Sequence, residues 1–100
     1  MLNISKETID KTLKMGLEGR LDTVTAPQLE EALKESTDSI TELVFDLSKL
    51  EYISSAGRRV LLSMQKIMNK QGTMKILGAN ENIMEIFEVT GFVDILNIEK

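Results

Sequence analysis

The side chains that could carry out chemistry in this sequence are oxygens and amines, with no imidazoles or thiols among them. The chain contains neither histidine nor cysteine, so it lacks the usual general base, the thiol nucleophile and the common ligands of transition metals. Any catalysis would rest on carboxylates, lysines or hydroxyls. We therefore expect no catalytic residue, no metal site and no cofactor, and we predict a binding protein in preference to an enzyme.

The most distinctive hydroxyl groups belong to the adjacent Ser54 and Ser55, which precede a long stretch of helical periodicity. The N-terminus of a helix carries free backbone N–H groups and the positive end of the helix dipole, so a phosphate on either serine would find donors facing it. Serine is also a favoured N-cap for purely structural reasons, worth ~1 kcal/mol. Local chemistry alone favours the capping role over phosphorylation.

Apolar periodicity predicts the strands that would position these serines. Alternation with a period of two predicts one strand at Leu2 and Ile4 and another through Leu13, Met15 and Leu17. The continuous apolar run 43–45 predicts a central strand covered on both faces. Two further strands are predicted over 74–77 and 93–98.

Helical spacing of apolar residues predicts three helices between these strands. The first runs over 26–35, after a threonine cap and with an early proline. The second is the longest, since its apolar positions repeat from the serine pair to Gly72. Asn80 caps the third, which Gly91 closes.

The resulting order is ββαβαβαβ, in a single α/β domain over residues 1–100. It predicts a mostly parallel or mixed five-stranded sheet with right-handed crossovers and three to four helices, in which the first strand is able to pair antiparallel. Loops beyond the carboxyl ends of such strands usually carry the functional surface. Three segments reach that edge: 19–22, 46–55 and 78–80.

Composition narrows the range of partners. A net charge of −4 argues against a nucleic-acid surface. The N-terminus lacks the features of a signal peptide, and no apolar run approaches the ~18 residues of a membrane span, so we expect a soluble, cytoplasmic protein that does not insert into membranes. An unrelated small-molecule binder or enzyme on the same sheet has no positive support, because the chain has no phosphate-binding loop and Asp22, Asp46 and Lys75 form no obvious phosphoaspartyl receiver set.

Three segments of the chain resemble a known family. The stretch DLSKLEYISSAGRRVLL resembles the STAS domain, the family shared by anti-sigma factor antagonists and the cytoplasmic tails of sulfate transporters. The segment 19–22 is similar to the family's Gly-Glu-Leu-Asp loop, and Ile86-Phe87 with Thr90-Gly91-Phe92 is similar to the end of its third helix. Matched residue by residue, the resemblance implies that Ser55 is the phosphorylated hydroxyl.

The resemblance also implies a function, that of an anti-sigma factor antagonist. The unphosphorylated protein would bind a serine kinase that also serves as anti-sigma factor, which frees the sigma factor for transcription. Phosphorylation of Ser55 would dissolve the complex, a serine phosphatase would restore it, and the antagonist itself would be a monomer or weak dimer. The alternative is a non-switching accessory subunit of a transporter ATPase or signalling scaffold, in which Ser55 is only a cap and contact residue.

The partner-binding surface implied by the resemblance surrounds the same turn. Asp22 matches a family aspartate that lies beside the phosphorylated serine, but it is equally an ordinary turn residue. Ser54 stands where many antagonists carry aspartate, and Arg58 where leucine is usual. Arg58 and Arg59 are either solvated, or attract an acidic partner, a nucleotide phosphate or the phosphoserine. The full set is Asp22, Ser54, Ala56, Gly57, Arg58 and Arg59.

Overall fold

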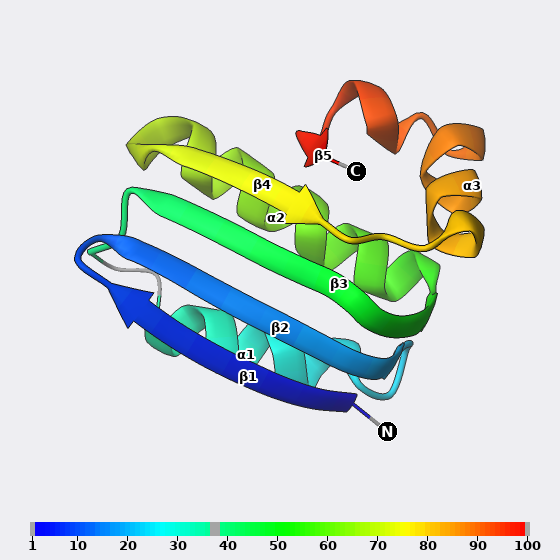
Figure 1. Ribbon diagram of the computed structural model, residues 1–100, viewed down its shortest axis with the longest axis horizontal. Coiled ribbons are helices and arrows are strands. Elements are labelled where there is room, and N and C mark those ends of the chain that lie inside the picture. The colour runs from blue at the N-terminus through cyan, green and yellow to red at the C-terminus, as the bar shows by residue number, and fades with distance from the viewer. Residues whose placement is uncertain (1, 37–38, 100) are drawn as a thin grey trace.

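The computed structural model describes residues 2–36 and 39–99. Within them the chain forms the expected alternation of strands and helices (Figure 1). The strands are β1 (Leu2–Ile9), β2 (Thr12–Leu21), β3 (Glu42–Ile53), β4 (Thr73–Leu77) and β5 (Ile98–Glu99). The helices are α1 (Ala26–Ser36), α2 (Ser55–Gln71), α3 (Glu81–Val89) and the short 3₁₀ turn η1 (Phe92–Asp94).

The five strands form one mixed sheet in the order β1-β2-β3-β4-β5. β1 pairs antiparallel with β2 through a tight turn at Asp10, whose φ of 54° is a left-handed conformation that aspartate tolerates. The remaining neighbours pair in parallel. The predicted α/β class, mixed sheet and antiparallel first strand are confirmed.

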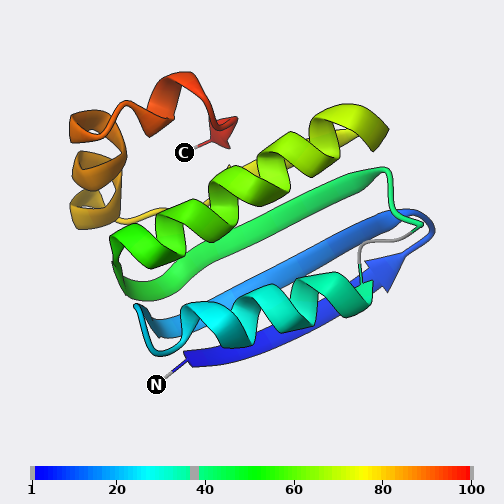
Figure 2. The ribbon, with the colours of Figure 1, turned by 180° about the vertical axis from the view of Figure 1, so that it is seen from behind.

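Helices α1 and α2 cover the same face of the sheet (Figure 2). Each connects a strand to its next neighbour in the same direction, and successive right-handed crossovers of that kind bring their helices to the same side. On β3, Leu43 and Phe45 face this side and are buried, whereas Val44 and Asp46 on the other face are only half-buried. The prediction that this strand is covered on both faces is therefore wrong.

The buried apolar residues form one cluster that runs from Leu2 to Leu96. It fills the layer between the sheet and the helices, because the alternating positions of β2 and β3 meet the apolar faces of α1 and α2 there. The largest fully buried side chains include Leu13, Met15, Leu17, Leu29, Leu33, Phe45, Leu47, Leu50 and Phe87.

β3 is longer than its apolar core predicts. The ladder between β2 and β3 contains register shifts between Gly16 and Glu18 and between Gly19 and Arg20, which place extra residues on β3. These irregularities let pairing continue past polar residues to Ile53. The segments 19–21 and 46–53, which we expected in loops, therefore belong to strands.

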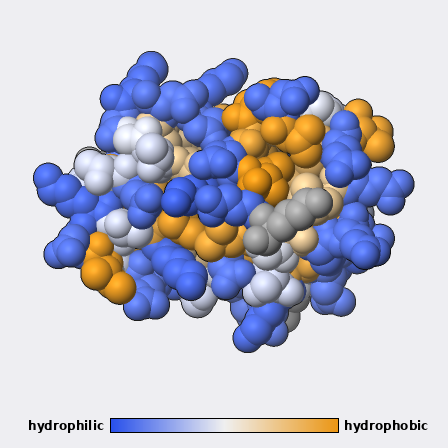
Figure 3. Space-filling view, turned by 45° about the horizontal axis from the view of Figure 1, so that its top comes forward, coloured by the Kyte–Doolittle hydropathy of each residue, from blue (hydrophilic) through white to orange (hydrophobic). Residues whose placement is uncertain are grey.

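The C-terminal segment differs most from the prediction. Residues 93–98 were expected to form a strand, but pairing is limited to Ile98 and Glu99. Gly91 adopts a φ of 78°, and the backbone N–H groups of Ile95 and Leu96 both bond to the carbonyl of Phe92. The chain thus satisfies its hydrogen bonds locally and cannot offer them to β4. Figure 3 shows apolar side chains gathered at this end of a mostly hydrophilic face, and the exposed ones are Val89, Val93 and Ile95.

Candidate functional site

The serine pair lies at the N-terminus of α2, beside the carboxyl end of β2. Ser54 is the N-cap residue: its hydroxyl oxygen accepts a hydrogen bond from the backbone N–H of Gly57 at 3.4 Å. Its own N–H donates to the carbonyl of Leu21 at 2.8 Å, and this bond ties the helix start to β2. Ser54 is half-buried and its hydroxyl already has a structural partner.

Ser55 is the first residue of α2 and is exposed. Its hydroxyl makes no hydrogen bond within residues 2–36 and 39–99. The two adjacent serines therefore differ in availability, since one is occupied by capping and the other faces solvent. The predicted phosphoacceptor is the available one.

Gly57 brings the first turn of α2 close to the ends of β2 and β3. It is buried, and a Cβ placed there would lie 2.6 Å from Leu21 Cγ and 3.0 Å from Ile53 Cγ1. Only glycine allows this approach without displacing those side chains. Gly57 thus has a packing role and offers a partner little surface, whereas its neighbour Ala56 is half-buried at the helix surface.

Asp22 organises the turn between β2 and α1. Its Oδ1 accepts hydrogen bonds from the backbone N–H groups of Val24 at 3.0 Å and Thr25 at 3.1 Å, and from the Thr25 hydroxyl at 3.2 Å. The bond from the Thr25 N–H, helped by those from the Thr25 hydroxyl and the Val24 N–H, lowers the pKa of the Asp22 carboxyl. Within the described chain its carboxylate bonds to its own loop and not to Ser55. This favours the turn role over orientation of the serine hydroxyl.

The residues around Asp22 complete a polar cluster that sequence reasoning missed. Thr25 is buried, and its single hydroxyl proton is shared between the Arg20 carbonyl at 2.9 Å and Asp22 Oδ1 at 3.2 Å, while its oxygen accepts from the Asp22 N–H at 2.8 Å. It precedes α1 as a cap would, but its bonds run back into the turn. Arg20 lies 3.9 Å from Asp22 Oδ2 and 4.5 Å above the ring of Tyr52. The spacing Asp-x-x-Thr was the available signal for this motif.

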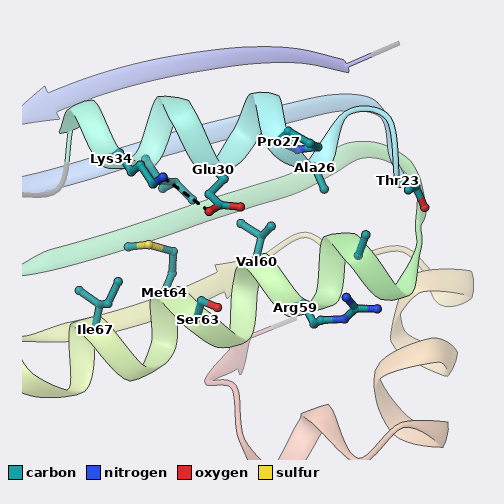
Figure 4. Close-up of a pocket in the computed structure, with 12 residues that line it drawn as sticks. Thr23, Ala26, Pro27, Glu30, Lys34, Arg59, Val60, Ser63, Met64 and Ile67 are labelled. Atoms are coloured by element: carbon teal, nitrogen blue, oxygen red, sulfur yellow. Dashed lines mark ion pairs between the residues drawn. The ribbon is translucent and has the colours of Figure 1, made fainter.

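Arg58 and Arg59 face two different hollows on either side of α2. Arg58 is half-buried and borders a groove of about 430 Å³ between α2 and α3, with Glu85, Ile86 and Val89. Arg59 is exposed and borders a groove of about 440 Å³ between α1 and α2 (Figure 4). We call these the α2/α3 groove and the α1/α2 groove. Neither arginine has an ion-pair partner in the described part of the chain.

The arrangement leaves the Ser55 hydroxyl open to solvent at the surface of the domain. No cluster of three or more acidic residues suited to a metal ion occurs among the described residues. No helix within 2–36 and 39–99 has the length and apolar character needed to cross a membrane.

The second carboxyl with a shifted pKa belongs to Asp46, which lies on the uncovered face of the sheet. A hydrogen bond from the Ser48 N–H lowers the pKa of this carboxyl.

A mixed sheet with α1 and α2 on one face, and an exposed serine at the start of α2, defines a small single α/β domain. The chain belongs to the STAS domain family, whose model matches residues 3–100. It is 31% identical to the anti-sigma-B factor antagonist of Staphylococcus aureus (strain NCTC 8325) over 101 residues, which cover 99% of this chain and 94% of that protein.

Solved structures show the same fold. The crystal structure of an anti-sigma factor antagonist from Mycobacterium paratuberculosis has a TM-score of 0.89 at 25% identity, covering 98% of this chain and 85% of that one. The phosphorylated form of the Bacillus cell fate determinant SpoIIAA has a TM-score of 0.75 at 16% identity, covering 98% of this chain and 92% of that one. The match to the family model and the 31% identical relative confirm the expected family, and these structures confirm its fold.

Proposed function

We propose that this chain is an anti-sigma factor antagonist whose binding to its partner is controlled by phosphorylation of Ser55. The observation that carries the proposal is the exposed, unbonded hydroxyl of Ser55 at the first position of α2. The relatives named as anti-sigma factor antagonists support an anti-sigma factor as the partner. That partner also acts as the serine kinase, and a separate serine phosphatase reverses the modification.

The chain acts as a substrate and ligand, so the proposed role requires no catalytic group of its own. The γ-phosphoryl group of ATP passes to Ser55 Oγ with loss of the hydroxyl proton, and ADP leaves. The phosphatase hydrolyses the ester with water to serine and inorganic phosphate. This cycle takes place in the cytoplasm, with the antagonist as a monomer or weak dimer.

The division of labour between the two serines explains why the switch leaves the fold intact. Ser54 caps the helix whether or not Ser55 is modified, so phosphorylation removes no structural hydrogen bond. A phosphoserine adds about −1.5 to −2 charges, and the positive end of the helix dipole stabilises negative charge at that position. The new charge should therefore change the stability of the domain little and should mainly weaken the binding of a partner at this turn.

The partner-binding surface in this proposal comprises the exposed and half-buried residues beside Ser55. Ser54, Ala56, Arg58 and Arg59 adjoin it along the first turn of α2. A partner that packs closely on this turn must desolvate the phosphate or move away from it. A loss of ~3 kcal/mol at such a contact weakens binding about a hundredfold.

Phosphorylation of purified protein by the kinase that co-purifies with it tests the assignment. With ATP, intact-mass and fragment spectra should show one phosphate on Ser55. Ser55→Ala should abolish the modification, whereas Ser54→Ala, its matched control at the adjacent hydroxyl, should keep it. A phosphate that persists on Ser55→Ala would sink the assignment.

Binding measurements test the switch itself. The unphosphorylated protein and Ser55→Ala should bind the co-purified partner equally well, and the phosphorylated protein about a hundredfold more weakly. Equal affinity of the two forms would contradict partner switching. Co-purification of a transporter ATPase in place of a kinase would instead support the accessory-subunit alternative.

A further inference from the structure

The α1/α2 groove is hollow, apolar and unfilled by the domain's own side chains. Leu33, Val60 and Met64 form its floor and belong to the core, with exposed fractions of 2%, 8% and 5%. Ile67 on its wall remains 45% exposed. The volume of about 440 Å³ falls at the smaller end of the range for small-molecule sites, which are typically apolar with a few placed polar groups.

The charges around the α1/α2 groove leave one cation without a counterion. Glu30 and Lys34 project from α1 and pair with each other at 3.8 Å, so together they add no net charge (Figure 4). Arg59 lies at the other end of the groove and has no ion-pair partner in the described residues. The groove thus combines an apolar channel with a single uncompensated guanidinium at one end.

The dimensions along α2 indicate the size of a matching ligand. Arg59 and Ile67 are eight residues apart on one helix, which corresponds to roughly 12 Å at 1.5 Å per residue. An alkyl chain of medium length spans that distance. An anionic group at one end of such a chain would face Arg59, and the methylene groups would cover Val60, Met64 and Ile67.

We propose that the α1/α2 groove binds a medium-chain amphipathic carboxylate, with the carboxylate on Arg59 and the chain along the apolar floor. Bulk electrostatics would not produce such binding, because the protein carries a net charge of −4 and repels anions overall. Carboxylate recognition by an arginine is charge-assisted and directional, which suits a single guanidinium at the end of an apolar channel. Binding of the carboxylate does not require the proposed phosphorylation of Ser55.

Its position nevertheless couples it to that switch, a consequence that does rest on the proposed function. Ser55 and Arg59 are four residues apart in α2, so their side chains are neighbours on the helix surface. A carboxylate bound at Arg59 would place a negative charge beside the phosphorylated serine. The phosphorylated protein should therefore bind the carboxylate more weakly than the unphosphorylated protein, because the two negative charges repel each other.

Calorimetric titration with decanoate, below its micelle concentration, tests the site directly. We expect saturable binding with one site per chain, and weaker binding of decanol and decyltrimethylammonium, which have the same chain but lack the anionic head. Ser63→Trp, at an exposed position bordering the groove, should block decanoate while circular dichroism shows an unchanged fold. Absence of saturable decanoate binding by the wild-type protein would overturn the proposal.

Two adjacent arginines provide a matched pair of variants. Arg59→Gln should weaken decanoate binding about tenfold, because it removes the charge at the head group. Arg58→Gln removes the same charge one residue away but borders the α2/α3 groove, so binding should stay within twofold of wild type. Equal weakening by both variants would indicate general electrostatic attraction and refute the site. Ser55→Ala should bind decanoate normally, which separates this result from the fate of the phosphorylation proposal.

Discussion

At the scale of single residues, neighbouring polar groups of similar type have different tasks. Ser54 caps α2 and bonds to the end of β2, and Asp22 organises the turn after β2. Ser55 is exposed, and its hydroxyl makes no hydrogen bond in the described part of the chain. A hydroxyl that the fold does not use is one that a modification can change without unfolding the domain.

The hydrogen bonds to Asp22 predict a dependence of stability on acid pH. They lower the pKa of the folded carboxyl below its ordinary value of 3.8. The stabilisation is therefore fully present above pH 3.8, the value in the unfolded chain, and is lost as the pH falls through the lower folded pKa. Urea unfolding at a series of pH values should show the stability advantage of wild type over Asp22→Asn shrinking in that acid window.

Asp46 also contributes to the acid dependence of stability, because the hydrogen bond from the Ser48 N–H lowers the pKa of its carboxyl. Both proteins compared retain Asp46, so its contribution cancels in the difference. A constant difference between wild type and Asp22→Asn across the acid range would show that the Asp22 carboxylate contributes nothing through its charge.

At the scale of elements, the start of α2 depends on its close approach to β2 and β3 at Gly57. Gly57→Ala should improve helix propensity by ~1 kcal/mol, but the added methyl group meets Leu21 at 2.6 Å. Overpacking of this kind typically costs about 1–3 kcal/mol, so we expect a net loss of stability on urea unfolding. Ser55→Ala, two residues earlier and exposed, should change stability by less than about 0.5 kcal/mol. A Gly57→Ala protein more stable than wild type would show that the strand ends relax freely.

The elements also show what could be predicted from the sequence and what could not. The bounds of α2 follow from local signals, a serine cap and Gly72 around an apolar face of helical period. The length of β3 does not, because bulges in its pairing with β2 extend it past Ser48 and Lys49. The α1/α2 groove and the α2/α3 groove could not be predicted from the sequence either, because each is formed by side chains of helices far apart in the sequence.

At the scale of the whole molecule, one apolar cluster joins the sheet to the helices. The C-terminal segment contributes little to this cluster and to the sheet. β5 contributes only two paired residues, opposite Ile76 and Leu77. Among residues 92–99, Leu96 is the buried apolar side chain, at 4% exposed, while Phe92 and Ile98 are half-buried. This segment should therefore open before the rest of the sheet unfolds.

Leu96→Ala tests whether this segment opens separately from the sheet, because it truncates the buried apolar side chain of residues 92–99. Truncation of a buried leucine to alanine typically costs about 2–5 kcal/mol, so η1 and β5 should detach from the sheet while β2 and β3 stay paired. Hydrogen exchange can follow this release, because the Ile76 N–H bonds to the Asn97 carbonyl at 2.9 Å. The Ile76 amide should lose much more protection than the amide of Phe45 in the middle of β3.

Ile95→Ala, a truncation at the adjacent but 49% exposed position, should leave both amides nearly unchanged. Equal loss of protection at Ile76 and Phe45 in Leu96→Ala would instead mean that the C-terminal segment and the central sheet unfold as one unit.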